Sequence, residues 1–249
     1  MADPLKPTTS PLTAGRNPVI PAVASDAGLR TYMLAVYNYM ASGLLLTGIV
    51  AMLVANSAGV RAVFFAASGT PTLLGWIAVF APLALVFTLS VGINRLSEPT
   101  VKALFWTYAI LMGVSLSTIL LAYTGVSVAR TFFVTAAAFG GLSLWGYTTK
   151  RNLSAFGTFL IMGVVGLLIA MIVNMFLRSS TLDLIVSAIG VLLFAGLTAF
   201  DTQKIKSVYF DVAGTEFRGK AVVMGALTLY LDFLNLFLFL LRFMGDRRQ

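Results

Sequence analysis

The sequence predicts an all-α membrane protein built as a bundle of seven transmembrane helices. Hydrophobic residues make up 59% of the 249 residues and charged residues only 10%, and the mean hydropathy is +0.93. Soluble domains carry roughly 25% charged residues, so an ordinary soluble enzyme is excluded. Seven apolar stretches follow one another along the chain and leave no segment for a soluble domain.

The first 28 residues are predicted to form a disordered, Pro-rich N-terminal tail. Five prolines, at positions 4, 7, 11, 18 and 21, stand among Ser, Thr and Ala residues. This segment lacks the continuous apolar region of a signal peptide. We therefore expect residues 1–28 to be a tail and residues 29–249 to be the transmembrane domain.

The seven apolar stretches are the predicted membrane spans. A helix that crosses the hydrocarbon core needs about 20 predominantly apolar residues. The stretches run from Tyr32 to Ala55, Leu73 to Ile93, Val101 to Tyr123, Val128 to Thr148, Leu153 to Phe176, Leu182 to Phe200 and Ala221 to Phe243. Most connections are short, which favours antiparallel neighbours in one bundle, and only residues 56–72 and 206–220 are expected to form longer loops.

Several spans carry pairs of small residues. Small residues let helices approach each other closely in lipid, so we expect these pairs at helix–helix contacts. The pairs are Ala136 with Gly140, Gly163 with Gly166, and Gly190 with Gly196.

The basic residues predict a cytoplasmic N-terminus. With this orientation, eleven Lys and Arg residues lie in the tail and the inner loops, whereas three lie in the outer loops. Arg242, Arg247 and Arg248 then lie outside, against the rule. We expect the seventh stretch to be a full span, and the alternative is a re-entrant segment that returns the C-terminus to the cytoplasm.

Two residue types are absent, and their absence excludes several kinds of chemistry. The chain has no Cys and no His, which excludes thiolate nucleophiles, Cys-ligated zinc and Ser-His catalysis. The net charge of +8 fits an anionic membrane surface better than nucleic acid, because the basic residues stand singly or in pairs between apolar runs. We expect no enzyme activity, no cofactor and no nucleic-acid partner.

Asp232 is one of two acidic residues that do not fall in tails, in loops or clearly at a span end. It lies about 11 residues into the seventh span, or roughly 16 Å deep, near the bilayer midplane. An Asp at a helix centre costs about 2.5–3.5 kcal/mol to insert, so its side chain must face the bundle interior or water. Thr228 and Asn235 share its face as a polar stripe, and the opposite face is suited to lipid. That opposite face carries Leu227, Leu234, Leu238 and Leu241.

Asp201, the second such residue, stands at the C-terminal end of the sixth apolar stretch. Two interpretations remain open from spacing alone. In the first, Asp201 is an interfacial charge with Lys204 as a surface partner. In the second, the helix continues to about Tyr209 and holds Asp201 inside the bundle at the depth of Asp232. Thr198 would then share its face, and the lysines that follow would reach outward.

If the two carboxyl groups meet, they form a latch that responds to pH. Like charges in a low-dielectric site cannot both ionise cheaply, so the pair titrates as a unit and a shared proton bridges the two helices. Loss of that proton pushes the helices apart or admits a cation. Carboxylate oxygens suit calcium, but Ca²⁺ takes about 6–8 oxygen ligands. Asp201 and Asp232, with Thr198, Asn235 and water, would therefore make a weak transit site.

The segments around both aspartates resemble the signature segments of the Bax inhibitor-1 family, the transmembrane Bax inhibitor motif proteins. These segments are LTAFDTQKIK (197–206) and ALTLYLDFLNLFLFLLRFMG (226–245). The second match is long and specific. Together with the chain length, the number of spans and the basic short loops, the resemblance covers about residues 29–245 and is that of a bacterial member.

This resemblance implies a seven-helix bundle with the C-terminal helix at its centre, and a pH-sensitive calcium leak. The two-aspartate sensor of the family falls on Asp201 and Asp232. A basic residue at the end of the second span is implied to latch the closed state against the aspartate of the sixth span. Arg95 is the best placed residue for this role, although the match around GINRLSEPTVK is poor, and a positive-inside anchor is its alternative role.

The expected function is a pH-sensitive calcium leak channel of a bacterial inner membrane, with calcium, protons and the lipid bilayer as its partners. The chain carries no organelle-targeting segment, which favours this location. Arg95, Thr198, Thr228 and Asn235 are the expected gate or supporting polar residues around the two aspartates.

Three other functions are weighed against the channel. A regulatory membrane protein would bind and modulate another membrane protein, such as a membrane protease, with the tail as docking segment. An intramembrane aspartyl protease is disfavoured, because Phe200-Asp201 and Leu231-Asp232 do not match its Tyr-Asp and Gly-x-Gly-Asp signatures. A proton-coupled transporter is disfavoured because no inverted repeat is seen.

Overall fold

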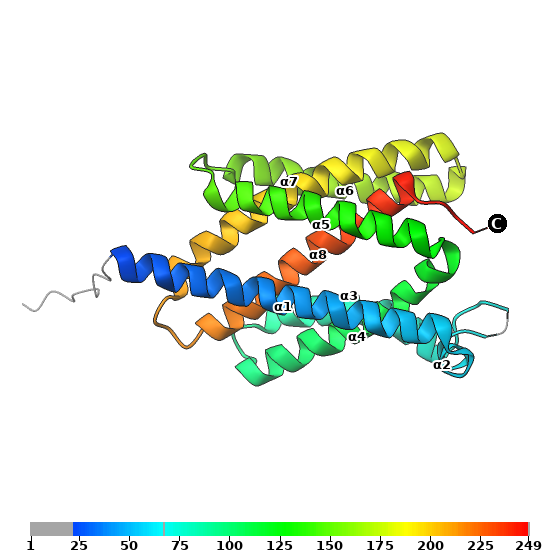
Figure 1. Cartoon of the computed structure of the whole chain (residues 1–249), viewed down its shortest axis with the longest axis horizontal. Coiled ribbons are helices and arrows are strands. Elements are labelled where there is room, and N and C mark those ends of the chain that lie inside the picture. The colour runs from blue at the N-terminus through cyan, green and yellow to red at the C-terminus, as the bar shows by residue number, and fades with distance from the viewer. Residues whose placement is uncertain (1–21, 67, 249) are drawn as a thin grey trace, which may run out of the picture.

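The computed structural model describes residues 22–66 and 68–248. Within these residues the chain forms eight helices, and seven of them are long and apolar enough to cross a membrane, which confirms the expected fold class. The helices are α1 (Ala22–Asn56), α2 (Ala58–Phe64), α3 (Leu73–Gly92), α4 (Glu98–Ala122), α5 (Gly125–Thr148), α6 (Ser154–Leu177), α7 (Ser180–Val212) and α8 (Arg218–Met244) (Figure 1).

The N-terminal helix is longer than the sequence predicts. It begins at Ala22, so residues 22–28 of the expected tail are helical. This short segment lies beyond the last of the clustered prolines and contains three alanines, which favour a helix. The rest of the expected tail, residues 1–21, lies outside the described residues.

Both segments predicted as longer loops are partly helical. The short helix α2 occupies part of 56–72, and the side chain of Ser57 accepts a hydrogen bond from the backbone N–H of Val60 at its start. The expected loop 206–220 is reduced to residues 213–217, because α7 continues to Val212. Tyr209 and Val212 are buried in the core, and this burial extends the helix past the last apolar run.

Hydroxyl side chains fix the start of most helices. At these positions a Ser or Thr oxygen accepts a backbone N–H of the first turn, which satisfies a donor that has no partner within the helix. The capping residues are Ser57, Thr72, Ser97, Thr124 and Ser179. Because helices can start abruptly at these caps, the connections stay short and neighbouring helices run antiparallel.

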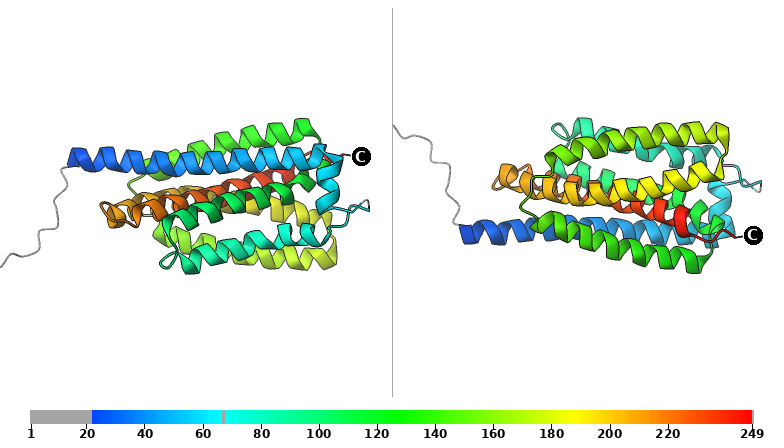
Figure 2. Two further views of the ribbon diagram at one scale, coloured as in Figure 1. Left: turned by 90° about the horizontal axis from the view of Figure 1, so that it is seen from below. Right: turned by 90° about the horizontal axis from the view of Figure 1, so that it is seen from above.

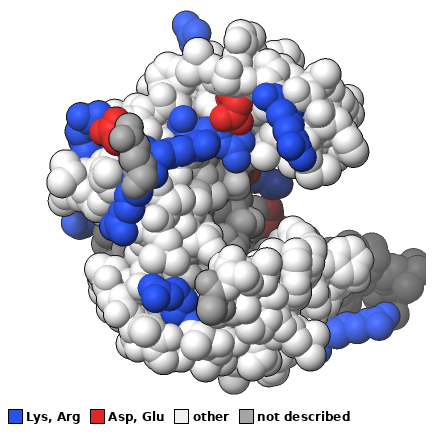
Figure 3. Space-filling model, turned by 90° about the vertical axis from the view of Figure 1, so that its right-hand side faces the viewer, with Lys and Arg blue, Asp and Glu red and all other residues white. Residues whose placement is uncertain are grey.

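The helices form two groups that α8 joins. In the first group α1 and α3 pack against α4, and in the second group α5 and α6 pack against α7. Helix α8 runs obliquely between the groups and contacts α1, α4, α5 and α7 (Figures 1 and 2). Seen along the bundle, a notch separates the two groups on one side (Figure 3).

The C-terminal helix is the centre of the fold, as expected. In its most apolar stretch 72% of the residues are buried, whereas the share in the other six spans is 11 to 44%. The prediction that one face of α8 meets lipid is therefore wrong. Leu227, Leu234 and Leu241 on that face are buried, because four helices surround α8.

Helix α8 also crosses the whole bundle. It is an unbroken helix of 27 residues, about 40 Å long, so the re-entrant alternative for the seventh span is wrong. The start of α1 and the C-terminus lie at opposite ends of the molecule (Figure 1). We call the end at which α1 and α8 finish the C-terminal end of the bundle.

The expectation for the small residues holds in part. A Cβ atom added at Gly163, Gly190 or Gly196 would lie within 3 Å of a side chain on a neighbouring helix, so these glycines are at helix contacts. At Gly140 and Gly166 it would meet nothing within 4 Å, so these two do not mediate close packing.

Two glycines of α5 provide a matched test of this packing. A Cβ atom at Gly146 would clash with the backbone carbonyl of Ala199 on α7, whereas the space around Gly140 is open. We expect Gly146→Ala to lower the free energy of unfolding by about 1–3 kcal/mol through overpacking. Gly140→Ala should leave it unchanged or raise it by up to about 1 kcal/mol, since Ala favours a helix. Thermal unfolding in detergent measures both, and equal midpoints for the two variants would contradict the α5–α7 contact.

Candidate functional site

The two aspartates singled out from the sequence lie side by side in the bundle. The side chains of Asp201 on α7 and Asp232 on α8 are within hydrogen-bonding reach of each other. Asp232 is 4% exposed and Asp201 is half-buried. Of the two interpretations left open for Asp201, the structure has the continuous helix, because α7 runs 11 residues beyond Asp201 to Val212.

The α7–α8 hairpin brings these carboxyl groups together. The two helices are consecutive and packed along their length, and Gly214 in the turn between them adopts a φ of +77°. Gly225 permits close approach, since an added Cβ atom would lie 3.2 Å from the side chain of Ile205. Asp201 is 11 residues before the end of α7 and Asp232 is 14 residues after the start of α8. Both therefore lie about 16–21 Å from the end of the bundle that holds this turn.

The surroundings of the pair leave it without a counter-ion. The Oδ2 atom of Asp232 is buried and has no hydrogen-bond partner among the described residues. Neither carboxyl group forms an ion pair within residues 22–66 and 68–248, where the two ion pairs join other residues. Two ionised carboxylates would repel each other strongly here, so the arrangement suits a pair that shares one proton and releases it as a unit.

Three polar residues expected beside the pair are bound to their own helices. The hydroxyl of Thr198 donates to the carbonyl of Phe194 at 2.8 Å, and that of Thr228 donates to Met224 at 3.1 Å. The amide nitrogen of Asn235 likewise donates to the carbonyl one turn earlier, at 2.9 Å. These contacts satisfy the side-chain donors locally, and the hydrogen bonds of the described residues do not include one from them to either carboxyl group.

The structure does not bring Arg95 to the aspartates. Arg95 is exposed in the turn between α3 and α4, and α3 packs mainly on α2 and α4 rather than on α7. Lys204, the surface partner considered for Asp201, is also exposed. Lys206 instead donates to the backbone carbonyl of Tyr147 at 2.8 Å and lies 4.9 Å from the centre of its ring.

The donor set around the pair is too small to hold a calcium ion firmly. Within the described residues no group of three or more His, Cys, Asp or Glu side chains is placed to bind a metal ion. Calcium takes about 6–8 oxygen ligands, so two carboxyl groups supply only part of its coordination shell. The site can contact a passing cation but not store one tightly.

A row of hydroxyl groups lies next to Asp201, and spacing in the sequence did not predict it. Tyr37 of α1 bonds Ser143 of α5 at 2.5 Å, and Ser143 bonds Thr202 of α7 at 2.9 Å. Thr202 in turn bonds the backbone carbonyl of Thr198 at 2.7 Å. The only signal in the sequence is the general one that polar groups at membrane depth need partners inside the protein.

A second set of hydroxyl contacts fixes the position of α8 near Asp232. Tyr230 is fully buried, and its hydroxyl bonds the Thr47 hydroxyl on α1 at 2.7 Å. Thr47 also donates to the backbone carbonyl of Ala109 on α4 at 2.8 Å. One threonine therefore links α1, α4 and α8 two residues from the carboxyl pair.

Removing the two partners of this contact should have unequal effects. Tyr230→Phe removes one hydrogen bond and should lower the free energy of unfolding by about 0.5–1.5 kcal/mol. Thr47→Val leaves the Tyr230 hydroxyl buried without a partner and should lower it by about 1–3 kcal/mol. Thr107→Val, at an exposed position of α4, is the control and should change little. Unfolding in detergent gives the three values, and a smaller effect for Thr47→Val than for Tyr230→Phe would refute this assignment.

Comparison with known proteins places the chain among bacterial membrane proteins. Residues 29–249 match the family model described as "Inhibitor of apoptosis-promoting Bax1". The chain is 50% identical to the inner membrane protein YbhL of Escherichia coli K12, over 91% of this chain and 96% of that protein. It is 49% identical to an uncharacterized protein of Rickettsia prowazekii, over 90% and 93% of the two chains. An uncharacterized protein of Caulobacter vibrioides is 46% identical over 90% and 92%.

Proposed function

The chain belongs to the Bax inhibitor-1 family of integral membrane proteins, and we propose that it is a pH-sensitive calcium leak channel with Asp201 and Asp232 as its sensor. One observation carries the proposal. Two carboxyl groups from consecutive central helices are in contact, and one of them is 4% exposed. Ionisable side chains at membrane depth are rare, because they are costly to insert, and those present mark ion or proton pathways.

The proposed mechanism follows from the charge of the pair. At low pH a proton shared by the two carboxyl groups holds α7 and α8 together. As the pH rises the proton leaves, and the two negative charges repel each other in a low-dielectric setting. The repulsion is relieved when the helices separate or when a cation lies between the carboxylates. Calcium fits the second outcome, since it prefers carboxylate oxygens, and the small donor set lets it leave again.

The central position of α8 suits it to transmit this change. Helix α8 contacts members of both helix groups, so a shift of α8 away from α7 alters the contact between the groups. We further propose, from the distribution of Lys and Arg, that the N-terminus is cytoplasmic and that the membrane is a bacterial inner membrane.

The proposal is tested by calcium influx into proteoliposomes from about pH 6 to pH 8. The purified chain, Asp201→Asn and Asp232→Asn are compared with Asp211→Asn, which removes an exposed carboxylate of the same helix α7. Influx should rise with pH in the unmodified chain and in Asp211→Asn. In the other two variants the pair can no longer carry two charges, so influx should become nearly independent of pH.

Two results would count against the proposal. An unchanged pH response in Asp201→Asn or Asp232→Asn removes the sensor role of that residue. Influx no greater than that of empty liposomes at every pH excludes the channel and favours a regulatory membrane protein, which co-purification from membranes would then identify by its bound partner.

A further inference from the structure

A long apolar groove lies between α1 and α5. These two helices do not pack on each other, and the space between them consists of two connected parts. One part, of about 1090 Å³, follows α1 and α5, and the other, of about 640 Å³, lies between α1, α4, α5 and α8. Gly48, Phe132 and Phe233 line both parts. The exposed side chains of Leu45 and Met52 stand at the lipid-facing side of α1 and are part of the same lining.

Two glycines keep this groove open. Gly48 of α1 and Gly140 of α5 line it, and a Cβ atom added at either position would meet nothing within 4 Å. A glycine inside a helix costs about 1 kcal/mol relative to alanine. At these two positions close helix packing does not account for the glycine, and what its absence of a side chain provides is space in the groove.

Two arginines stand at the C-terminal end of the groove. Arg61 of α2 and Arg248 line the smaller part, and no acidic residue lines it. Arg61 donates to the carbonyl of Ala55 at 3.1 Å, and the backbone N–H of Arg248 donates to the carbonyl of Ala122 at 2.9 Å. Both residues are thus anchored to helix ends, and within residues 22–66 and 68–248 neither forms an ion pair.

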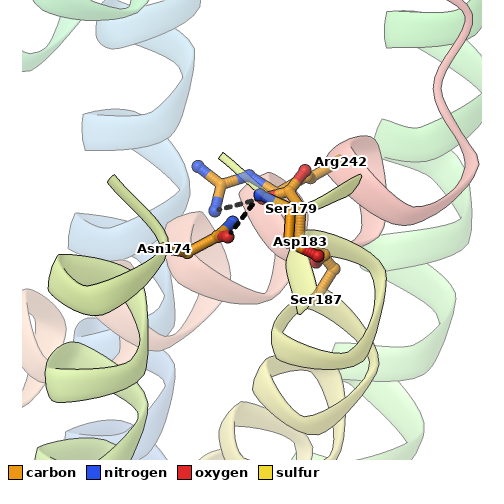
Figure 4. Close-up of polar contacts among 5 residues, drawn as sticks. All are labelled: Asn174, Ser179, Asp183, Ser187 and Arg242. Carbon is orange, nitrogen blue, oxygen red and sulfur yellow. Dashed lines mark hydrogen bonds and ion pairs between the residues drawn. The ribbon is translucent and has the colours of Figure 1, made fainter. Parts of the chain in front are cut away.

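Another arginine at this end of the bundle shows the contrast. Arg242 of α8 lies 3.6 Å from Asp183 at the start of α7, so its charge is matched within the protein (Figure 4). Basic side chains outnumber acidic ones on the end of the molecule that Figure 3 faces. The charges of Arg61 and Arg248 are therefore suited to an anion from outside the protein.

We propose that the smaller part of the groove binds one anionic phospholipid, with its phosphate at Arg61 and Arg248 and an acyl chain along α1 toward Phe233. The lining residues of α1 run from Leu44 to Asn56, a length of about 18 Å. One leaflet of the hydrocarbon core is about 15 Å thick, so the groove matches the depth of one acyl chain. Basic residues at the end of an apolar groove between helices complement a lipid headgroup.

Native mass spectrometry of the full chain in detergent tests this proposal, with phosphatidylglycerol as the added lipid. The unmodified chain should retain one lipid. The affinity should fall about fivefold for each of Arg61→Gln and Arg248→Gln, since each basic residue contributes on that order. Arg178→Gln, which removes an exposed arginine in the α6–α7 turn, is the matched control and should bind as the unmodified chain does.

A second pair of variants tests the apolar part of the groove. Gly48→Phe should block the acyl chain and lower binding more than tenfold, whereas Gly48→Ala should bind normally, because the space there is open. Glycerophosphoglycerol, the headgroup without acyl chains, should not displace the lipid. Equal binding by the arginine variants and the control would overturn the proposal. It would also be overturned if the headgroup alone competes equally, or if the chain is found as a dimer whose contact Gly48→Phe disrupts.

Discussion

The enclosure of α8 by four other helices is the condition that makes the carboxyl pair possible. A carboxyl group that faced hydrocarbon would be costly, and its only relief would be to reach toward the membrane surface. Inside the bundle Asp232 meets a second carboxyl group on α7, and the nearby Tyr230 and Thr47 hydroxyls hold α8 in register with α1 and α4. The pair is thus a product of the central position of α8, and the same position connects it with both helix groups.

The fold and the pair could be anticipated from the sequence for different reasons. The seven spans follow from apolar length alone, because a membrane requires about 20 apolar residues whatever their order. Asp232 is conspicuous because it interrupts such a stretch, whereas the depth of Asp201 depends on whether its helix continues, which hydropathy does not decide. Burial of Tyr209 and Val212 carries α7 onward, and this burial is a property of the packed bundle.

Other features could not be read from spacing. Tyr37, Ser143 and Thr202 come from three separate helices, and only the bundle places their hydroxyls in one row. The expected supporting role of Thr198 and Asn235 assumed that residues on one helix face turn toward the same partner. In the structure both donate to backbone carbonyls of their own helix, an alternative that is always within reach of short polar side chains. The groove between α1 and α5 is likewise invisible in either helix alone.

The position of α8 also bears on how the protein is made. Helices α1 and α4 are synthesised early, yet the buried aromatic cluster of Phe105 and Tyr108 is completed only by Tyr230, near the end of the chain. A ribosome must therefore release almost the entire polypeptide before the first helix pair acquires its permanent neighbour. Until then those helices must reside in the bilayer or beside the insertion machinery with an unfilled face, and truncation of the last 27 residues would leave them permanently in that unfinished condition.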